Sequence, residues 1–369
     1  MTTSVMGMED IVAAQSAITW IDGRAGELRY RGYSVSELVE NCSYESVAYL
    51  LWHGELPSET QLDSLRDPLR ADRVARADLL GGISALPRTA HPLDVLRYLV
   101  SADALRNPLT WENSREANLR KAIEFTAWFP VATAAYHRVR AGKEPVAPRP
   151  DLDTAANFLY MLNGAEASAT AVRTLDTSLI LHADHELNAS TFAARVTIAT
   201  ESNLHAAIAS ALGTLTGPRH GGASERVIRM LEEIGQPDRA EAYVRGELDA
   251  KRRIMGYGHR MYRTADPRSR YLRVMAEKML AGTERENWTA ILAALSTIME
   301  REKNLYPNVD LYAAVVNHEL GIDPAFYTAV FAVSRIAGWT AHAMEQFGGR
   351  MIRPAAEYIG PAPRSLTAP

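Results

Sequence analysis

The chain has 369 residues, of which 40 are Lys or Arg and 44 are Asp or Glu, so its formal net charge is −4. This length suffices for one large domain or two unequal ones, and the weak negative charge argues against broad binding to nucleic acid or membranes. Cys42 is the only cysteine, which excludes an intramolecular disulfide and a zinc site built on several thiolates.

The first residues, MTTSVMGMEDIV, carry neither the basic nor the apolar segment of a secretory signal. The chain contains no charge-free apolar run near the ~18 residues that a transmembrane helix needs. We therefore expect a cytoplasmic enzyme or binding protein.

Strand signals occur only near the start, where ITWIDGRAGELRYRGY (18–33) predicts a short β-hairpin that turns at Asp22-Gly23. Helical spacing and capping residues dominate the rest. Asp323 and Pro324 are expected to start the final helix, which should run to about Gly348. The sequence thus predicts an all-α protein with one short N-terminal hairpin. The sequence predicts helices most clearly over 154–164, 190–217, 225–235, 286–303 and 323–348. A further helix is predicted to begin at Ser58.

His220 lies in the glycine-rich loop TGPRHGG, directly before a predicted helix. Glycines let a ligand approach the backbone, and a helix N-terminus disfavours a charged imidazolium. A neutral His220 could donate a hydrogen bond to a developing oxyanion. A packing role for this histidine is the alternative.

His259 lies in GYGHRMYRTADPR, where Arg260, Arg263 and Arg268 follow it. Arginine binds carboxylates and phosphates in bidentate geometry, so the segment suggests a shaped anion site. A solvated basic loop is the alternative.

The segment LHADHELN contains His182, Asp184 and His185. A metal site is conceivable, but no third ligand with suitable spacing is evident. Helix packing or a substrate contact is the favoured interpretation.

Asp310 follows Asn308 just before an apolar helical run. Either residue could cap that helix, and a catalytic carboxylate would look the same in sequence.

Arg335 stands among apolar residues in AVFAVSRIAGW. A buried guanidinium must meet a carboxylate because an unpaired buried charge is very costly. That carboxylate belongs either to a core Asp or Glu or to a substrate.

These motifs together resemble the citrate synthase family over essentially the whole chain. GYGHRMYRTADPR is the most specific of them, with Met261 where the family usually has Val or Ile, and HADHE, GPRHGG and NVD match in the expected order. The resemblance implies a citrate synthase-like fold, with a large helical domain of residues 1–215 and 320–369 and a small domain of residues 216–319 that closes over the substrates.

The resemblance also implies an acyl-CoA condensing enzyme. Asp310 would remove the proton alpha to the thioester carbonyl, His220 would stabilise the resulting enolate, and His259 would donate to the ketone oxygen of oxaloacetate. The residues that would bind oxaloacetate are His185, Arg268 and Arg335, with Arg353 reaching in from the partner subunit of a homodimer. Coenzyme A would meet Arg263 through a phosphate and the backbone of Ile254, Gly256, Tyr257 and Gly258 near the adenine.

Coenzyme A enters this scheme as the thioester substrate, and neither a cofactor nor a metal is implied. Three alternatives stay open: a 2-methylcitrate synthase that uses propionyl-CoA, a non-catalytic homologue that binds coenzyme A or a dicarboxylate, and a metal-binding protein. One methylene is worth only about 1–3 kcal/mol of discrimination, so the sequence does not decide between the two thioesters.

Overall fold

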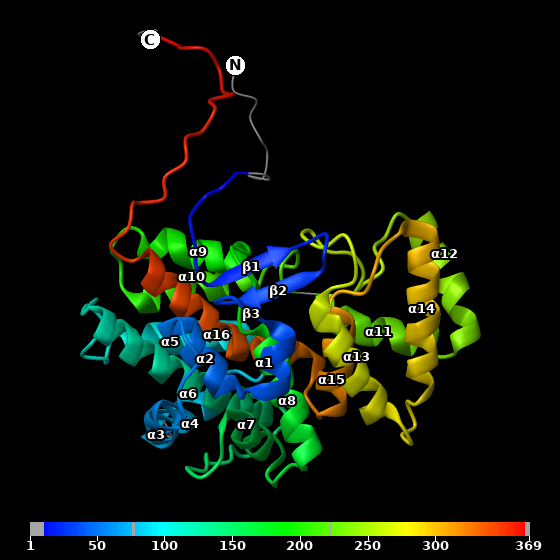
Figure 1. Ribbon diagram of the computed structural model, residues 1–369, viewed down its shortest axis with the longest axis horizontal. Helices are drawn as coiled ribbons and strands as arrows, with labels where there is room; N and C mark the ends of the chain where they lie inside the picture. The colour runs from blue at the N-terminus through cyan, green and yellow to red at the C-terminus, as the bar shows by residue number, and fades with distance from the viewer. Residues whose placement is uncertain (1–10, 76–77, 222, 366–369) are drawn as a thin grey trace.

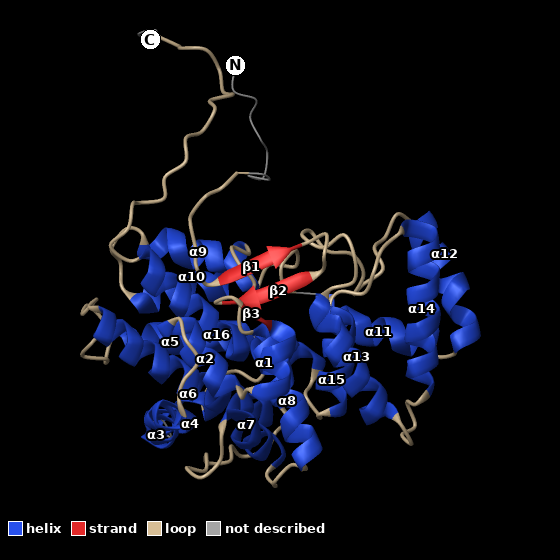
Figure 2. Ribbon diagram, in the orientation of Figure 1, coloured by secondary structure: helices blue, strands red, loops and turns tan. Residues whose placement is uncertain are grey.

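The computed structural model describes residues 11–75, 78–221 and 223–365. Helices make up most of it, and the strands form one small antiparallel sheet in the order β1-β2-β3 (Figure 2). The strands are β1 Thr19–Asp22, β2 Glu27–Tyr30 and β3 Tyr33–Ser34. The helices are α1 Val35–Asn41, α2 Tyr44–His53, α3 Glu59–Ala75, α4 Asp78–Ser84, α5 Pro92–Ala104, α6 Arg115–Arg140, α7 Thr154–Asn163, α8 Ala169–His182, α9 Ala189–Ile198, α10 Leu204–Leu215, α11 Ala223–Ile234, α12 Ala240–Asp249, α13 Pro267–Leu280, α14 Asn287–Lys303, α15 Val309–Glu319 and α16 Tyr327–Gln346, with 3₁₀ turns at Pro237–Arg239 and Pro324–Phe326.

The predicted hairpin and all-α class are confirmed, and several helix boundaries follow the expected local chemistry. Ser58 and Gln61 form a reciprocal capping box at the start of α3, with N···O distances of 2.9 and 3.3 Å. Gly164 ends α7 in the left-handed conformation with φ 78°. Asp323 accepts a hydrogen bond from Ala325 N (2.9 Å) ahead of α16.

The prediction of one continuous helix over 190–217 is wrong. The segment forms two helices, α9 and α10, which pack against each other. Asn203 starts α10 by accepting from Ala206 N (2.8 Å), and Glu201 takes a left-handed φ of 62° just before it. Asn188, not Ser190, caps α9, and the Ser190 hydroxyl donates to Asn188 Oδ1 (2.7 Å).

The core is centred on α6 and α16, two long helices that pack against each other and are buried along most of their length. The N-terminal part of the chain is bonded to α16. Tyr44 Oη donates to Val333 O (3.0 Å), and Trp52 Nε1 donates to Thr340 Oγ1 (2.9 Å). Residues from both ends of the chain therefore build one core.

Helices α11, α12, α13 and α14 gather at one end of the molecule, on the right in Figure 1. Helix α15 packs against α11 and α13 and also contacts α8 of the main helical body. The segments that carry the candidate residues therefore meet where helices α11–α15 join the remaining helices. The C-terminal residues beyond 350 leave the body as an extended segment (Figure 1).

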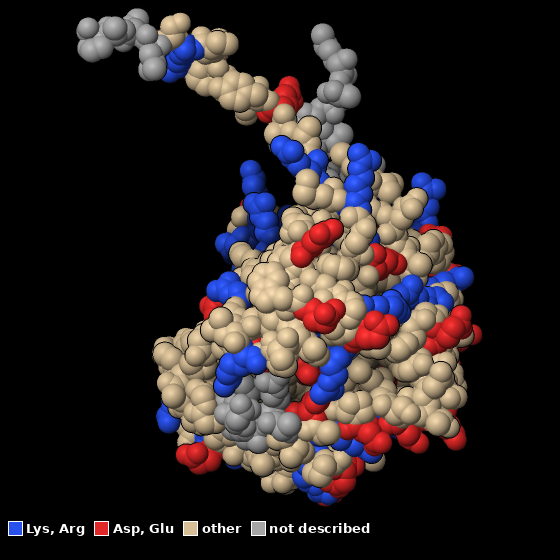
Figure 3. All heavy atoms as spheres, turned by 90° about the vertical axis from the view of Figure 1, so that its left-hand side faces the viewer, with Lys and Arg blue, Asp and Glu red and all other residues tan. Residues whose placement is uncertain are grey.

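Charged side chains of both signs are interspersed on the face shown in Figure 3. Helices within the described ranges are all too short or too polar to cross a membrane.

Candidate active site

The loop that carries His259 is fixed to the segment that precedes α15. Gly256 and Gly258 both have φ of 80°, a conformation that glycine adopts without strain. Gly258 N donates to Tyr306 O (2.9 Å), Asn308 N donates to Gly256 O (2.9 Å), and Asn308 Nδ2 donates to Gly258 O (2.9 Å). These bonds hold His259 close to the first turn of α15.

The hydrogen bonds of His259 assign its tautomer. Nδ1 accepts from the backbone N–H groups of Met261 (3.0 Å) and Tyr262 (3.3 Å), so the ring proton of a neutral imidazole must lie on Nε2. Burial, assisted by the positive charge of Arg268, lowers the pKa of His259 to about 4. His259 is therefore a neutral donor through Nε2 at neutral pH.

His220 has the opposite tautomer. Its Nε2 accepts from Ser190 N (3.3 Å) and lies 2.8 Å from Ser190 Oγ, so the proton of the neutral ring lies on Nδ1. Burial, and secondarily the charge of Arg335, lowers its pKa to about 4. Burial is therefore the main cause that favours a neutral His220.

Asp310 lies in the first turn of α15 but does not cap it. Asn308 is the cap, and its Oδ1 accepts from Asp310 N (3.0 Å). The Asp310 carboxylate accepts instead from Ser224 Oγ on α11 (2.7 Å) through Oδ1. Burial raises its pKa from the ordinary value, which makes the carboxylate a stronger base.

Arg268 is buried and paired with Asp266. Its Nε and Nη2 donate to the two carboxylate oxygens at 3.0 and 2.7 Å, while Asp266 Oδ2 also accepts from Val309 N (3.2 Å). After burial, the charge of Arg268 is the next cause that lowers the pKa of His182, His185 and His259. Arg268 therefore lies close to all three imidazoles.

Arg335 is 1% exposed and has no ion-pair partner among the residues that the structure describes. Its Nε donates to His182 O (2.6 Å), and its guanidinium carbon lies 4.4 Å from the centre of the Phe331 ring. Burial lowers its pKa to about 10. A buried cation without a carboxylate partner is costly, so the position suits an anionic ligand better than an internal ion pair.

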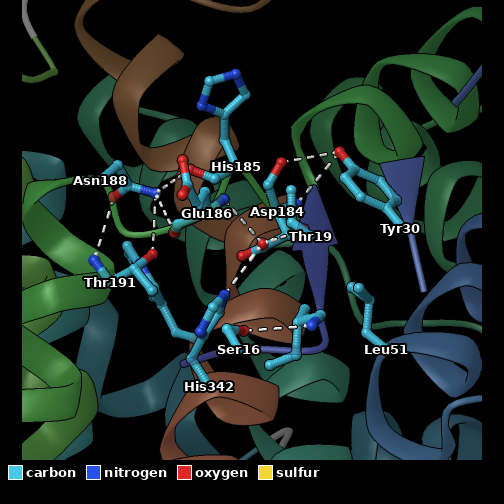
Figure 4. A network of polar contacts seen from close by, with 12 residues as sticks. Ser16, Thr19, Tyr30, Leu51, Asp184, His185, Glu186, Asn188, Thr191 and His342 are labelled. Carbon is cyan, nitrogen blue, oxygen red and sulfur yellow. Dashed lines mark hydrogen bonds and ion pairs between the residues drawn. The ribbon is translucent and has the colours of Figure 1, made fainter. Parts of the chain in front are cut away.

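The HADHE segment turns its side chains in different directions (Figure 4). Asp184 Oδ2 is bonded to Thr19 Oγ1 (2.5 Å) and His342 Nε2 (3.1 Å) inside the core. The His185 ring points away from that network, with Nε2 3.2 Å from Tyr262 Oη and the ring 5.2 Å from His259. Within the described ranges no three His, Cys, Asp or Glu side chains are grouped to hold a metal.

The remaining predicted residues lie outside this cluster. Arg263 is exposed and lines a groove with residues 20–24 and Met261. Ile254 and Tyr257 are buried, and Tyr257 Oη lies 3.1 Å from Ser296 Oγ, so only their backbone could meet a ligand. Arg353 is exposed on the extended C-terminal segment.

Sequence reasoning missed the residues that orient the candidates. Asp266 holds Arg268, Ser190 holds His220, and Tyr262 contacts His185. Asp266 could have been found, because an Asp before Pro267 is a typical helix start. The other two lie in contacts between distant segments that no local pattern reveals.

The buried histidines should make the fold sensitive to acid. The pKa values of His182, His220 and His259 are lowered to about 3, 4 and 4, below the unfolded value of about 6.5. The unfolded chain then takes up protons first as the pH falls, so the free energy of unfolding should decline from about pH 7 toward pH 4. Urea unfolding at several pH values measures this decline. His182→Asn should flatten it, and a variant with the wild-type slope would contradict the assignment.

Comparisons with known proteins show to which family the chain is similar. A family model described as "Citrate synthase, C-terminal domain" matches residues 7–355. Citrate synthase 2 of Bacillus subtilis is 43% identical over 361 residues, covering 97% of this chain and 96% of that protein. The 2-methylcitrate synthase 2 of Corynebacterium glutamicum is 37% identical over 372 residues, covering 99% and 97%.

A solved structure is similar over the same span. It is the ternary complex of citrate synthase from Thermoplasma acidophilum with carboxymethyl coenzyme A and oxaloacetate, with a TM-score of 0.92, 32% sequence identity and coverage of 98% of this chain and 97% of that one. The motifs, the fold and the full-length matches lead to one conclusion: the chain belongs to the citrate synthase family.

Proposed function

We propose that this enzyme condenses acetyl-CoA with oxaloacetate and water to give citrate and coenzyme A. The observation that carries the proposal is the pair of neutral histidines, His220 and His259, whose ring protons lie on opposite nitrogens. Asp310, a carboxylate of raised pKa, lies two residues after Asn308, whose side chain is bonded to the His259 loop. Each imidazole can donate to one carbonyl oxygen while Asp310 accepts a proton. The names of the relatives support the same reaction.

The first step would be removal of a proton from the alpha carbon of the thioester by Asp310. A thioester alpha carbon is a weak acid, so the base needs electrostatic help. His220 Nδ1–H would donate to the thioester oxygen as negative charge develops there. Ser190 holds Nε2 of this ring and thereby aims the opposite nitrogen at the substrate.

The enol would then attack the ketone carbon of oxaloacetate, and His259 Nε2–H would donate to the ketone oxygen as it becomes an alkoxide. Arg268, Arg335 and His185 would bind the carboxylates and hold the ketone in line, which removes an entropic barrier of several kcal/mol. Water would finally hydrolyse the citryl thioester and release coenzyme A. The scheme needs no metal.

Assembly and closure belong to the same proposal. Arg353 would reach the oxaloacetate of a partner subunit in a homodimer, because its extended segment leaves the body of its own chain. Residues 216–319 would form a small domain that closes on the rest, residues 1–215 and 320–369, and excludes water. Arg263 would meet a phosphate of coenzyme A beside the backbone of residues 254–258. The enzyme would act in the cytoplasm.

Thiol release with oxaloacetate, measured in parallel with acetyl-CoA and propionyl-CoA, tests the proposal. We expect the higher kcat/KM with acetyl-CoA and no change after treatment with a chelator. A higher value with propionyl-CoA would make the enzyme a 2-methylcitrate synthase, which the relative from Corynebacterium glutamicum keeps as the second candidate. Release with neither thioester would contradict the roles of Asp310, His220 and His259 and favour a binding protein.

A further inference from the structure

The turn of the β1–β2 hairpin lies against the loop that carries His259 (Figures 1 and 2). Asp22 Oδ1 accepts from Arg24 N (2.8 Å) and Ala25 N (2.9 Å), which keeps the turn tight. Gly23 O accepts from Arg263 N (2.7 Å). Segments some 240 positions apart in the sequence are therefore joined backbone to backbone, four residues beyond the histidine.

Gly23 leaves no room for a side chain at this contact. A Cβ atom there would lie 1.9 Å from Met261 O and 2.8 Å from Met261 C, so the backbone of the turn, of Met261 or of both would have to shift and the contact would change. Gly23 is not among the glycines with positive φ, and the requirement is therefore steric rather than conformational. At Gly26 a Cβ would meet Thr264 Cγ2 at 3.1 Å, so the whole turn packs closely on this loop.

The atom that Gly23 contacts belongs to the peptide unit that orients His259. Met261 C=O and Tyr262 N–H are parts of one planar peptide, and Tyr262 N–H donates to His259 Nδ1 together with Met261 N–H. A shift of the carbonyl must therefore move or rotate the N–H. We infer that Gly23 is a positioning residue, which holds the 261–262 peptide so that His259 presents its proton on Nε2 toward the substrate.

This inference rests on the proposed role of His259, and its consequence for turnover follows from that role. In Gly23→Ala the displaced peptide should no longer bind Nδ1 well, so both tautomers should be populated and fewer molecules should donate from Nε2. Losing a positioned proton donor costs up to about 10²–10⁴ in rate, and a partial loss should lower kcat by roughly 10- to 100-fold. The KM for oxaloacetate should change little, because Arg335 and Arg268 are not displaced.

Gly246→Ala is the matched control. It makes the same chemical change on α12, where a Cβ would have nothing within 4 Å, and it should keep wild-type kcat. Circular dichroism and melting temperature establish that each variant folds. If Gly23→Ala fails to fold, Asp22→Ala replaces it, because loss of the two turn hydrogen bonds should loosen the same contact with a smaller effect of the same sign.

The decisive measurement is the ¹⁵N spectrum of the histidine rings in the full-length protein, with the His259 signals assigned from His259→Gln. We expect a single neutral Nε2–H tautomer in the wild type and Gly246→Ala, and a mixture in Gly23→Ala or Asp22→Ala. A folded Gly23→Ala with the wild-type His259 spectrum and wild-type kcat would overturn the inference. A wild type without condensing activity would refute the proposed function instead, and the spectra would still decide the role of Gly23.

Discussion

Replacing Asp310 with asparagine should lower kcat by about 10²–10⁴ and leave oxaloacetate binding largely intact. Asparagine preserves the size of the side chain and can still accept from Ser224 Oγ, but it cannot take a proton from carbon. Burial raises the pKa of Asp310, so loss of its charge should not destabilise the fold. Thiol-release kinetics and calorimetric titration with oxaloacetate measure the two effects separately.

Asp67→Asn serves as the control for the chemical change itself, because Asp67 is exposed on α3. Ser224→Ala tests the environment of the base. It removes the hydrogen bond that lowers the pKa of Asp310, so the pKa should rise and the acid limb of the rate profile should move to higher pH. Near-normal turnover in Asp310→Asn would show that another group takes the proton.

Replacing Arg335 with methionine should raise the KM for oxaloacetate while the free protein keeps or gains stability. Truncating one partner of a buried, hydrogen-bonded charge pair costs about 2–5 kcal/mol, which corresponds to roughly 30- to 4,000-fold in affinity. In the free protein the same guanidinium is buried without a carboxylate partner among the described residues. An apolar side chain therefore removes a desolvation cost that the single hydrogen bond to His182 O (2.6 Å) offsets only in part. Steady-state kinetics measures the KM for oxaloacetate, and urea unfolding measures the stability of the free protein.

Arg195 provides a matched control for the stability half. It is as buried as Arg335, but it donates to Glu345 Oε2 (2.6 Å), Gln346 Oε1 (3.0 Å) and Gln15 O (3.1 Å). Arg195→Met should therefore lower the free energy of unfolding by about 3–5 kcal/mol, because it leaves buried acceptors unpaired. If Arg335→Met is destabilised as strongly as Arg195→Met, then Arg335 has a structural role and not a ligand-binding one.

Sequence patterns predicted most of the fold because capping chemistry is local. The Ser58–Gln61 box, Gly164 and Asp323 each act within a few residues of the helix end that they define. The break between α9 and α10 escaped prediction because apolar, alanine-rich sequence continues on both sides of it. Asn203 is a favoured helix cap and indicated a new helix start, but the continuous apolar pattern on both sides favoured a single helix.

The sequence predicted which residues belong to the candidate site, but it did not predict how they are arranged in space. Motifs named His220, His259 and Asp310, whereas their protonation states depend on groups brought in by the fold. The N–H of Ser190, which assigns the tautomer of His220, lies 30 residues away. The same holds for Arg335. Its apolar neighbours in the sequence predicted that it is buried, but they could not predict that it lacks a carboxylate partner among the described residues.

The bonds between the N-terminal region and α16 also bear on how the chain is made. Ala17 N donates to Glu345 Oε1 (2.8 Å), Tyr44 Oη donates to Val333 O, and Trp52 Nε1 donates to Thr340 Oγ1, all on the same helix. These partners lie in α16, about 290 to 330 residues after the segments that they bind, and contacts of such long sequence separation form late in folding. Until α16 has been synthesised, the nascent chain therefore carries uncovered apolar faces on its first helices, and a chain that stops before α16 lacks one of the two helices at the centre of its core.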